Sequence, residues 1–330
     1  MHPTRYLVAA GLLALTACGT VGDTGTSPKN EKISLVGVAG NAVDPYWTTL
    51  MCGATRKAKE LGVTLTWKAS QTPSSQDQQT NLDAALLTKP SGLILAPLQA
   101  GQFSAKVGQL MGQGLPVVVV NSPITPPTEY QLVQSDPDVH AFAKMIAKQV
   151  GHSGTFAVLG GRPGTVALDN RWKPVVTELA KVAPKVKVLD TEYTDFDRNK
   201  AASIVSSWMI AHPDLTAVYA VTGPEGGGAA AAVQQAGKQG KVKIYSYDAT
   251  PDVVSALKGG TITALLAQAP AVQGQKAVEV MVDYLKSAPA PGAVRQAAQP
   301  QILIPPKILT KDNVDLAEGQ DYLYKPTCDA

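Results

Sequence analysis

IYSYDATPD at residues 244–252 is the stretch that decides the fold. Its β-branched and aromatic residues predict a strand, and Thr250 and Pro251 suit the cap and first turn of a helix that follows at once. In an open parallel α/β sheet, the carboxyl end of a strand faces the crevice where ligands bind. We therefore expect the side chain of Asp248 to contact a small molecule bound in that crevice.

Four other strand-to-helix junctions repeat this arrangement of an apolar run followed by polar or aromatic residues. They are DPYW at 44–47, VNSP at 120–123, the segment from Gly164 to Arg171, and VTGP at 221–224. Because parallel strands end at the same edge of a sheet, these junctions can share one ligand. We expect the chain to bring all five edges around one polar molecule.

Short β-branched runs alternate with amphipathic segments along the rest of the chain. Up to residue 120 the pattern predicts strands at 33–38, 63–67, 92–96 and 116–120 and helices at 47–61, 75–87 and 101–113. A proline cluster at 123–127 interrupts the pattern, which resumes after Ser135 and continues to residue 304. The predicted fold class is α/β, with two Rossmann-like doubly wound lobes.

The length of the chain and its net charge bear on the number of lobes and on the class of ligand. A chain of 330 residues is long enough for two lobes with separate cores. Its net charge of +3, without a run of Lys or Arg, gives no electrostatic case for nucleic acid.

The first eighteen residues have the character of a targeting signal. A basic Arg5 precedes an apolar segment at 6–15 that is too short to span a bilayer, and LTAC at 15–18 resembles a bacterial lipobox. By this resemblance Cys18 becomes the lipidated first residue, and residues 19–32 form a flexible tether. The alternative is a plain secretory signal. Either way we expect an extracytoplasmic protein, in the first case lipid-anchored to the cell membrane.

Two cysteines remain, Cys52 and Cys328. In an oxidising compartment they can form a disulfide that ties the tail to the first helix, or they can stay as two unpaired thiols. Sequence gives no distance between them, so both readings stay open.

The residues of covalent or metal chemistry are missing from the sequence. The histidines lie at 2, 140, 152 and 212, without a metal-binding spacing. Glycine-rich runs at 160–164 and 223–228 match neither a Walker loop nor a dinucleotide fingerprint, and we interpret them as places of close backbone approach. No Gly-x-Ser-x-Gly elbow is present. We expect a binding protein with no cofactor, no metal and no enzymatic activity.

Several short motifs, in one order, resemble the second lobe of the ribose-binding protein and its relatives, the substrate-binding proteins of ABC sugar importers. They are TDFDR at 194–198, AHPD at 211–214, AGK at 236–238, YDATPD at 247–252 and AQAP at 267–270. Weaker similarity extends from residue 33 to about 304. The resemblance implies two lobes joined by a three-strand hinge. It assigns 33–135 and 269–299 to the first lobe, 136–268 and 300–312 to the second, and 313–330 to a tail on the surface.

The resemblance also implies a ligand set. In the first lobe Asp44 follows the first strand, and Tyr46 and Trp47 stand where the family has the two aromatics that sandwich the sugar ring. In the second lobe the matching positions are an arginine, an aromatic, a carboxylate that accepts sugar hydroxyls, and a hinge amide, which are Arg171, Phe196, Asp248 and Gln268.

Two positions depart from the family pattern. The Asp-Arg pair expected after the fourth strand is Asn121-Ser122, and the usual Asn-Asp after the strand ending near Ala220 is Thr222-Gly223. We keep Asn121 and Thr222 as candidate ligands. Because these changes remove a carboxylate, a guanidinium and an amide, the pattern favours another monosaccharide or an acyclic polyol over ribose.

Each candidate also has a purely structural interpretation. Asp248 and Asp44 can cap the helices that follow them, and Arg171 can be a solvated helix charge. Tyr46 and Trp47 can be core aromatics.

The resulting hypothesis is a monomeric, lipid-anchored solute-binding subunit that delivers a small neutral polyhydroxylated ligand to an ABC permease and its ATPase subunits. An alternative is a sensor component that presents a sugar-like signalling molecule to a receptor or kinase. A sugar-responsive repressor shares such lobes, but it needs an amino-terminal DNA-binding helix-turn-helix where this chain has its signal.

Overall fold

The computed structural model describes residues 32–99, 101–124, 131–151, 153–287 and 301–328. From Ile33 onward these residues belong to one compact unit. The predicted signal peptide, the lipidation site Cys18 and nearly all of the tether lie outside the described residues.

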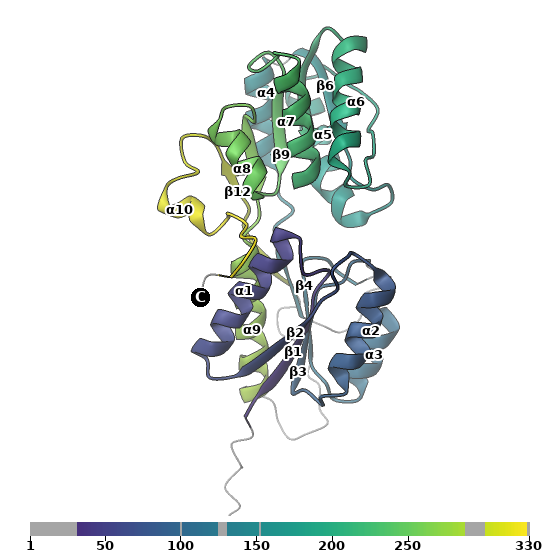
Figure 1. Cartoon of the computed structure of the whole chain (residues 1–330), viewed down its shortest axis with the longest axis vertical. Coiled ribbons are helices and arrows are strands. Elements are labelled where there is room, and N and C mark those ends of the chain that lie inside the picture. Colours follow the sequence, from purple (N-terminus) through teal and green to yellow (C-terminus); the bar gives the residue numbers. More distant parts are fainter. Residues whose placement is uncertain (1–31, 100, 125–130, 152, 288–300, 329–330) are drawn as a thin grey trace, which may run out of the picture. The chain divides into compact units, whose positions relative to one another are not determined.

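The first lobe is built on a parallel sheet with the strand order β11-β5-β4-β3-β1-β2. Figure 1 shows α1 and α9 on one side of this sheet and α2 and α3 on the other. The strands are Ser34–Val38 (β1), Thr64–Lys68 (β2), Gly92–Leu95 (β3), Val117–Val120 (β4), Gln131–Ser135 (β5) and Gln301–Ile304 (β11), and the helices are Pro45–Glu60 (α1), Ser75–Leu86 (α2), Ser104–Gly112 (α3) and Pro270–Ser287 (α9).

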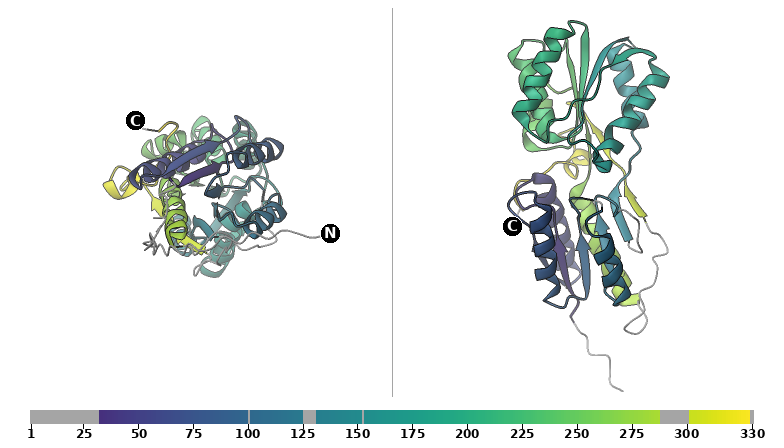
Figure 2. Two further views of the ribbon diagram at one scale, coloured as in Figure 1. Left: turned by 90° about the horizontal axis from the view of Figure 1, so that it is seen from below. Right: turned by 90° about the vertical axis from the view of Figure 1, so that its right-hand side faces the viewer.

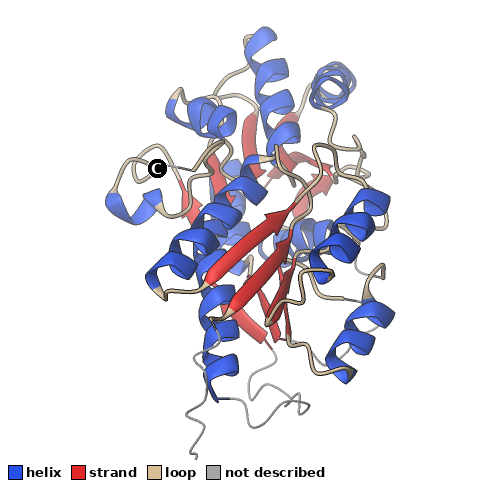
Figure 3. Ribbon diagram, turned by 60° about the horizontal axis from the view of Figure 1, so that its bottom comes forward, coloured by secondary structure: helices blue, strands red, loops and turns tan. Residues whose placement is uncertain are grey.

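The second lobe repeats this plan with the order β12-β10-β9-β8-β6-β7, in which only β12 runs antiparallel. In Figures 2 and 3 helices lie on both faces of its sheet. Its strands are Ser153–Leu159 (β6), Lys185–Val188 (β7), Leu215–Ala220 (β8), Lys243–Tyr247 (β9), Ala264–Ala267 (β10) and Lys307–Leu309 (β12), and its helices are His140–Val150 (α4), Val166–Val182 (α5), Arg198–Ala211 (α6), Gly223–Gln235 (α7), Pro251–Lys258 (α8) and Ala317–Gln320 (α10).

The central strands are apolar on both faces because both faces are covered. In β6, Phe156 and Val158 pack into a core with α4 and α5, whereas Ala157 and Leu159 belong to a core that includes α6 and α7. This alternation is the period of two that a strand imposes. It confirms the predicted α/β fold class with two doubly wound lobes.

The glycine run at 223–228 opens α7. A Cβ atom added at Gly226 would collide with the Ser246 side chain, and one at Gly228 would collide with the Arg198 carbonyl oxygen. These glycines therefore let α7 approach β9 and α6 closely, which agrees with our interpretation of the run as a place of close backbone approach.

The chain crosses between the sheets at 135–140, 267–270 and 304–307. The assignment of residues 300–312 to the second lobe was wrong in its first part. The strand β11 pairs in parallel with β5 of the first sheet, and the second lobe resumes only at β12. Pro305 and Pro306 end β11, since neither offers an N–H for continued pairing.

Candidate functional site

Asp248 is the centre of a buried polar cluster at the carboxyl end of β9. It lies directly after the last residue of the strand, and its φ of 67° turns the chain sharply there. Its side chain accepts hydrogen bonds at Oδ1 from Gln268 Nε2 (2.9 Å) and Tyr324 OH (2.7 Å), and at Oδ2 from Arg171 Nη1 (3.0 Å). The cap of α8 is Thr250. Asp248 therefore belongs to the cluster and is not the cap of that helix.

Arg171 extends from α5 into the same cluster with its side chain only 14% exposed. Nη1 also donates to the carbonyl oxygen of Val221 (2.9 Å), and the guanidinium lies 4.2 Å from the centre of the Tyr247 ring. Burial acts to lower the pKa of Arg171, but Asp248 and nearby phenols raise it above its ordinary value. Arg171 is thus a permanently charged, fixed donor, unlike a solvated helix charge.

A hydrogen-bonded chain leads from Asp248 into the first lobe. Gln268 Oε1 lies 3.5 Å from Gln273 Nε2, and Gln273 Oε1 accepts a hydrogen bond from Tyr46 OH at 2.9 Å. Gln273 is in the first turn of α9 and is fully buried. This series of hydrogen bonds joins Asp248 of the second lobe to Tyr46 of the first through the two buried amide side chains.

Gln273 was missed by sequence reasoning. Its signal was faint, a glutamine five residues beyond the hinge residue Gln268.

Asp44, Tyr46 and Trp47 lie where the first strand gives way to α1. Asp44 caps the helix by accepting a hydrogen bond from the Tyr46 N–H (2.8 Å), and its side chain is exposed. Partial desolvation raises the pKa of Asp44, and the negative charge of Asp248 adds a smaller rise. The hydrogen bond from the Tyr46 N–H and the charge of Arg171 act to lower this pKa but do not cancel the rise. Tyr46 and Trp47 are buried and meet edge to face with ring centres 4.8 Å apart. The two aromatics therefore pack in the core, and the Tyr46 hydroxyl is linked to the polar cluster through Gln273.

Tyr324 is the second residue that sequence reasoning missed. The tail was expected on the surface, but the Tyr324 side chain is only 4% exposed. Its N–H donates to the carbonyl oxygen of Ala249 (3.0 Å), and its ring lies 5.7 Å from that of Tyr46. The structure joins Cys52 to Cys328 in a disulfide, with a Cα–Cα distance of 5.3 Å. Most residues of the described tail, 313–328, are exposed, and the disulfide and the buried Tyr324 ring attach the tail to the rest of the protein.

Asn121, Thr222 and Phe196 are predicted site residues whose described hydrogen bonds and ring contacts are made outside the cluster. Asn121 has a φ of 73° at the end of β4, where its N–H donates to the Val133 carbonyl oxygen. Thr222 is buried, and its hydroxyl donates to Glu225 (3.0 Å). Phe196 is 38% exposed, and its ring contacts the Arg162 guanidinium.

Glu225 is a fully buried carboxylate that ties together the junctions after β6, β7 and β8. Oε1 accepts hydrogen bonds from the Gly161 N–H (2.9 Å) and the Thr194 hydroxyl (2.6 Å), and Oε2 accepts that of Thr222. Burial raises its pKa, and the hydrogen bonds oppose the shift. Glu225 orders the loops that carry Thr222 and Phe196.

The cluster contains donors and acceptors suited to hydroxyl groups. The described residues contain no group of three His, Cys, Asp or Glu side chains that could hold a metal ion. They also contain no helix that is both long and apolar enough to cross a bilayer.

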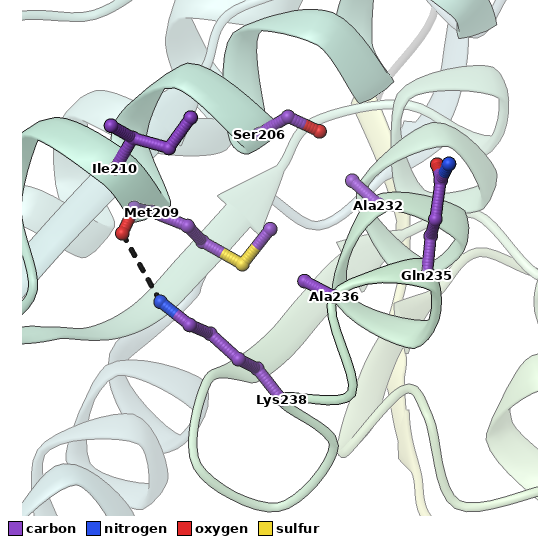
Figure 4. Close-up of a pocket in the computed structure, with 7 residues that line it drawn as sticks. All are labelled: Ser206, Met209, Ile210, Ala232, Gln235, Ala236 and Lys238. Carbon is purple, nitrogen blue, oxygen red and sulfur yellow. Dashed lines mark hydrogen bonds between the residues drawn. The ribbon is translucent and has the colours of Figure 1, made fainter.

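A separate pocket of about 290 Å³ lies between the last turns of α6 and α7, lined by Met209, Ile210, Ala232 and their neighbours (Figure 4). Because these helices begin near the carboxyl ends of the strands, their last turns lie at the other end of the sheet from Asp248. The pocket contains none of the predicted site residues.

Comparison with known families gives a clear result. The model of the periplasmic binding protein domain matches residues 36–289. The chain belongs to this family of periplasmic binding proteins. The match confirms the resemblance to the ribose-binding protein and its relatives.

Curated relatives cover most of the chain. The xylitol-binding protein of Mycolicibacterium smegmatis is 29% identical over 94% of this chain and 86% of its own length. The ribose import binding protein RbsB of Salmonella typhimurium is 29% identical over 74% and 81%. Among solved structures, an ABC transporter solute-binding protein from Agrobacterium vitis, bound with α-D-tagatopyranose, aligns with a TM-score of 0.79 and 27% identity, over 89% of this chain and all of that one.

Proposed function

We propose that the chain is the extracytoplasmic, lipid-anchored solute-binding component of an ABC importer, and that it binds a neutral monosaccharide or sugar alcohol between its two lobes. The observation that carries this proposal is the cluster of Asp248, Arg171 and Gln268, which places a fixed carboxylate, guanidinium and amide at the carboxyl ends of the strands of the second sheet. The names of the relatives support it, since they describe proteins that bind xylitol, ribose or tagatopyranose.

The chemistry of the cluster matches hydroxyl groups. Asp248 accepts hydrogen bonds, and Arg171 donates them from a planar fork of which only Nη1 is bonded among the described residues. Hydrogen bonds that involve a charged partner are stronger than those between neutral groups. A molecule with adjacent hydroxyls can donate to Asp248 and accept from Arg171 at once.

Both lobes contribute to the proposed ligand set. Asp44, Tyr46, Trp47 and Asn121 come from the first lobe, and Arg171, Phe196, Thr222, Asp248 and Gln268 from the second. A ligand shifts the equilibrium between two conformations only by its differential affinity for them. Hydroxyl contacts to Asp44 that form only when the lobes approach would favour a closed form, which the permease recognises.

The departures at Asn121 and Thr222 narrow the ligand class. Asn121 presents an amide where the family pattern has a charged pair, and the hydroxyl of Thr222 is engaged by buried Glu225. A sugar that needs charged partners at these places would leave hydroxyls unpaired, which costs about 1–3 kcal/mol for each buried group. We therefore favour a sugar alcohol such as xylitol, or a monosaccharide other than ribose.

A ligand screen tests this function. The chain that begins after Cys18 is titrated with xylitol, D-ribose, D-allose and D-tagatose while melting temperature and tryptophan fluorescence are followed together. Ligand at a hundredfold excess over Kd stabilises the native state by about 2.7 kcal/mol, which gives a rise of several degrees. A response to one compound and a weaker one to ribose supports the proposal, whereas silence across the panel contradicts it and favours a sensor of a different molecule.

A further inference from the structure

The carboxy-terminal segment spans the two lobes beside the polar cluster. After β12 it turns at Thr310, whose N–H donates to Asn313 Oδ1 (2.8 Å), and it then passes Ala249 of the second lobe. Farther on, the N–H of Lys325 donates to the Thr49 hydroxyl on α1 (2.6 Å), and Cys328 is bonded to Cys52 on the same helix. Residues 324–328 are therefore fixed to both lobes.

The Tyr324 hydroxyl uses part of the hydrogen-bonding capacity of Asp248. A carboxylate has about four lone-pair positions. Gln268 and Tyr324 donate to Oδ1, and Arg171 donates to Oδ2, so three positions are taken. One lone-pair position, on Oδ2, is left for a ligand hydroxyl. Oδ2 is also the oxygen that accepts the hydrogen bond from Arg171.

We propose that Tyr324 is a specificity-determining residue of this site, held in place by the Cys52–Cys328 disulfide. The inference rests on the proposed function in that the ligand is a polyol or sugar that reaches Asp248. Tyr324 closes Oδ1 to ligand, and Asp248 therefore accepts one hydroxyl, next to the group that Arg171 binds. Without the Tyr324 hydroxyl, Oδ1 and Oδ2 of Asp248 can each accept one ligand hydroxyl. That arrangement suits a ligand with a different spacing of hydroxyl groups.

The test compares two isosteric substitutions at neighbouring tyrosines. Tyr324→Phe removes only the hydroxyl that donates to Asp248. Tyr322→Phe is the matched control, because its hydroxyl donates to the Pro305 carbonyl oxygen (3.3 Å), outside the cluster. The dissociation constants of both variants and of the wild type are measured by calorimetry for xylitol, D-ribose, D-allose and D-tagatose.

We expect Tyr324→Phe to change the ratio between the two best dissociation constants of the wild type by at least fivefold, while Tyr322→Phe keeps that ratio within twofold. An equal change for all probes means that Tyr324 has only a structural role and overturns the inference, as does no change. A paired Cys52→Ser and Cys328→Ser variant should shift the ratio in the same direction as Tyr324→Phe.

A ligand-free measurement separates this inference from the proposed function. Hydrogen exchange is followed at the Tyr324 amide, which donates to the Ala249 carbonyl oxygen. Reduction of the disulfide should speed this exchange at least tenfold, and an unchanged rate overturns the role of the disulfide. If the wild type binds none of the four probes, a tenfold effect on exchange leaves the positioning of Tyr324 standing and shows that the proposed ligand class is wrong. If probes bind and the exchange rate does not move, the disulfide part of the inference fails alone.

Discussion

Replacing Asp248 by Asn keeps the shape of the side chain but removes the buried negative charge that faces Arg171. Breaking a buried ion pair from one side costs about 3–5 kcal/mol. Arg171 keeps the Val221 carbonyl oxygen and the face of Tyr247, so we expect the lower end, about 3 kcal/mol of unfolding free energy. Arg171→Met leaves Asp248 with two donors, Tyr324 and Gln268, and the loss of the charged hydrogen bond costs about 2 kcal/mol.

The double variant shows whether these costs come from one interaction. With both charges gone, no unpaired ion stays buried, and replacing a whole buried pair is often nearly neutral. The double variant should therefore be more stable than the sum of the single changes predicts, by about 2–3 kcal/mol. The assay is urea unfolding at pH 7 without ligand. The matched control is the exposed pair Arg198–Asp252, whose coupling should stay below about 1 kcal/mol. Additive effects of Asp248→Asn and Arg171→Met would refute the reasoning.

Three further predictions concern the support of the site. Because the pKa of Glu225 is raised by burial, its carboxyl favours the folded state below its ordinary pKa of 4.5 and loses that contribution as pH rises through the raised value. The melting temperature of Glu225→Gln relative to that of the wild type should therefore be higher at pH 8 than at pH 4, and an equal difference at both pH values would contradict this. Gly228→Ala should cost about 1–3 kcal/mol in urea unfolding because its Cβ meets the Arg198 carbonyl oxygen, while Gly112→Ala, with open space at the Cβ and no positive φ, serves as a control for packing. Reducing the Cys52–Cys328 disulfide, which closes a loop with a sequence separation of 276 residues, should lower the unfolding free energy by up to about 5 kcal/mol, and an unchanged urea midpoint would argue against it.

Sequence predicted the fold well because local patterns determine it. Apolar β-branched runs such as Val117–Val120 favour strands covered on both faces, and the cap and proline at Thr250-Pro251 fix where α8 begins. The prediction of the chain path near the third crossing was wrong because β11 is a short strand between prolines. Its partner is chosen by long-range pairing with β5 and not by its own pattern.

Only part of the polar cluster was predicted, because local motifs mark some of its residues and tertiary structure places the others. Asp248, Arg171 and Gln268 lie at junctions or in motifs that sequence reveals. Tyr324 reaches the same cluster from 76 residues beyond Asp248, and Gln273 joins it through the packing of α9 against α1. Their positions depend on tertiary structure, which no local spacing encodes.

The central claim is that Asp248 accepts a hydroxyl group of a small neutral ligand. Calorimetric titration of the wild type and of Asp248→Asn with xylitol and the three monosaccharides tests it most directly, with Asp283→Asn as a matched control at an exposed position near the end of α9. We predict that the wild type binds at least one compound and that Asp248→Asn weakens its affinity at least tenfold, equivalent to about 1.4 kcal/mol, while its melting curve shows a folded protein. Full affinity in folded Asp248→Asn would contradict the account.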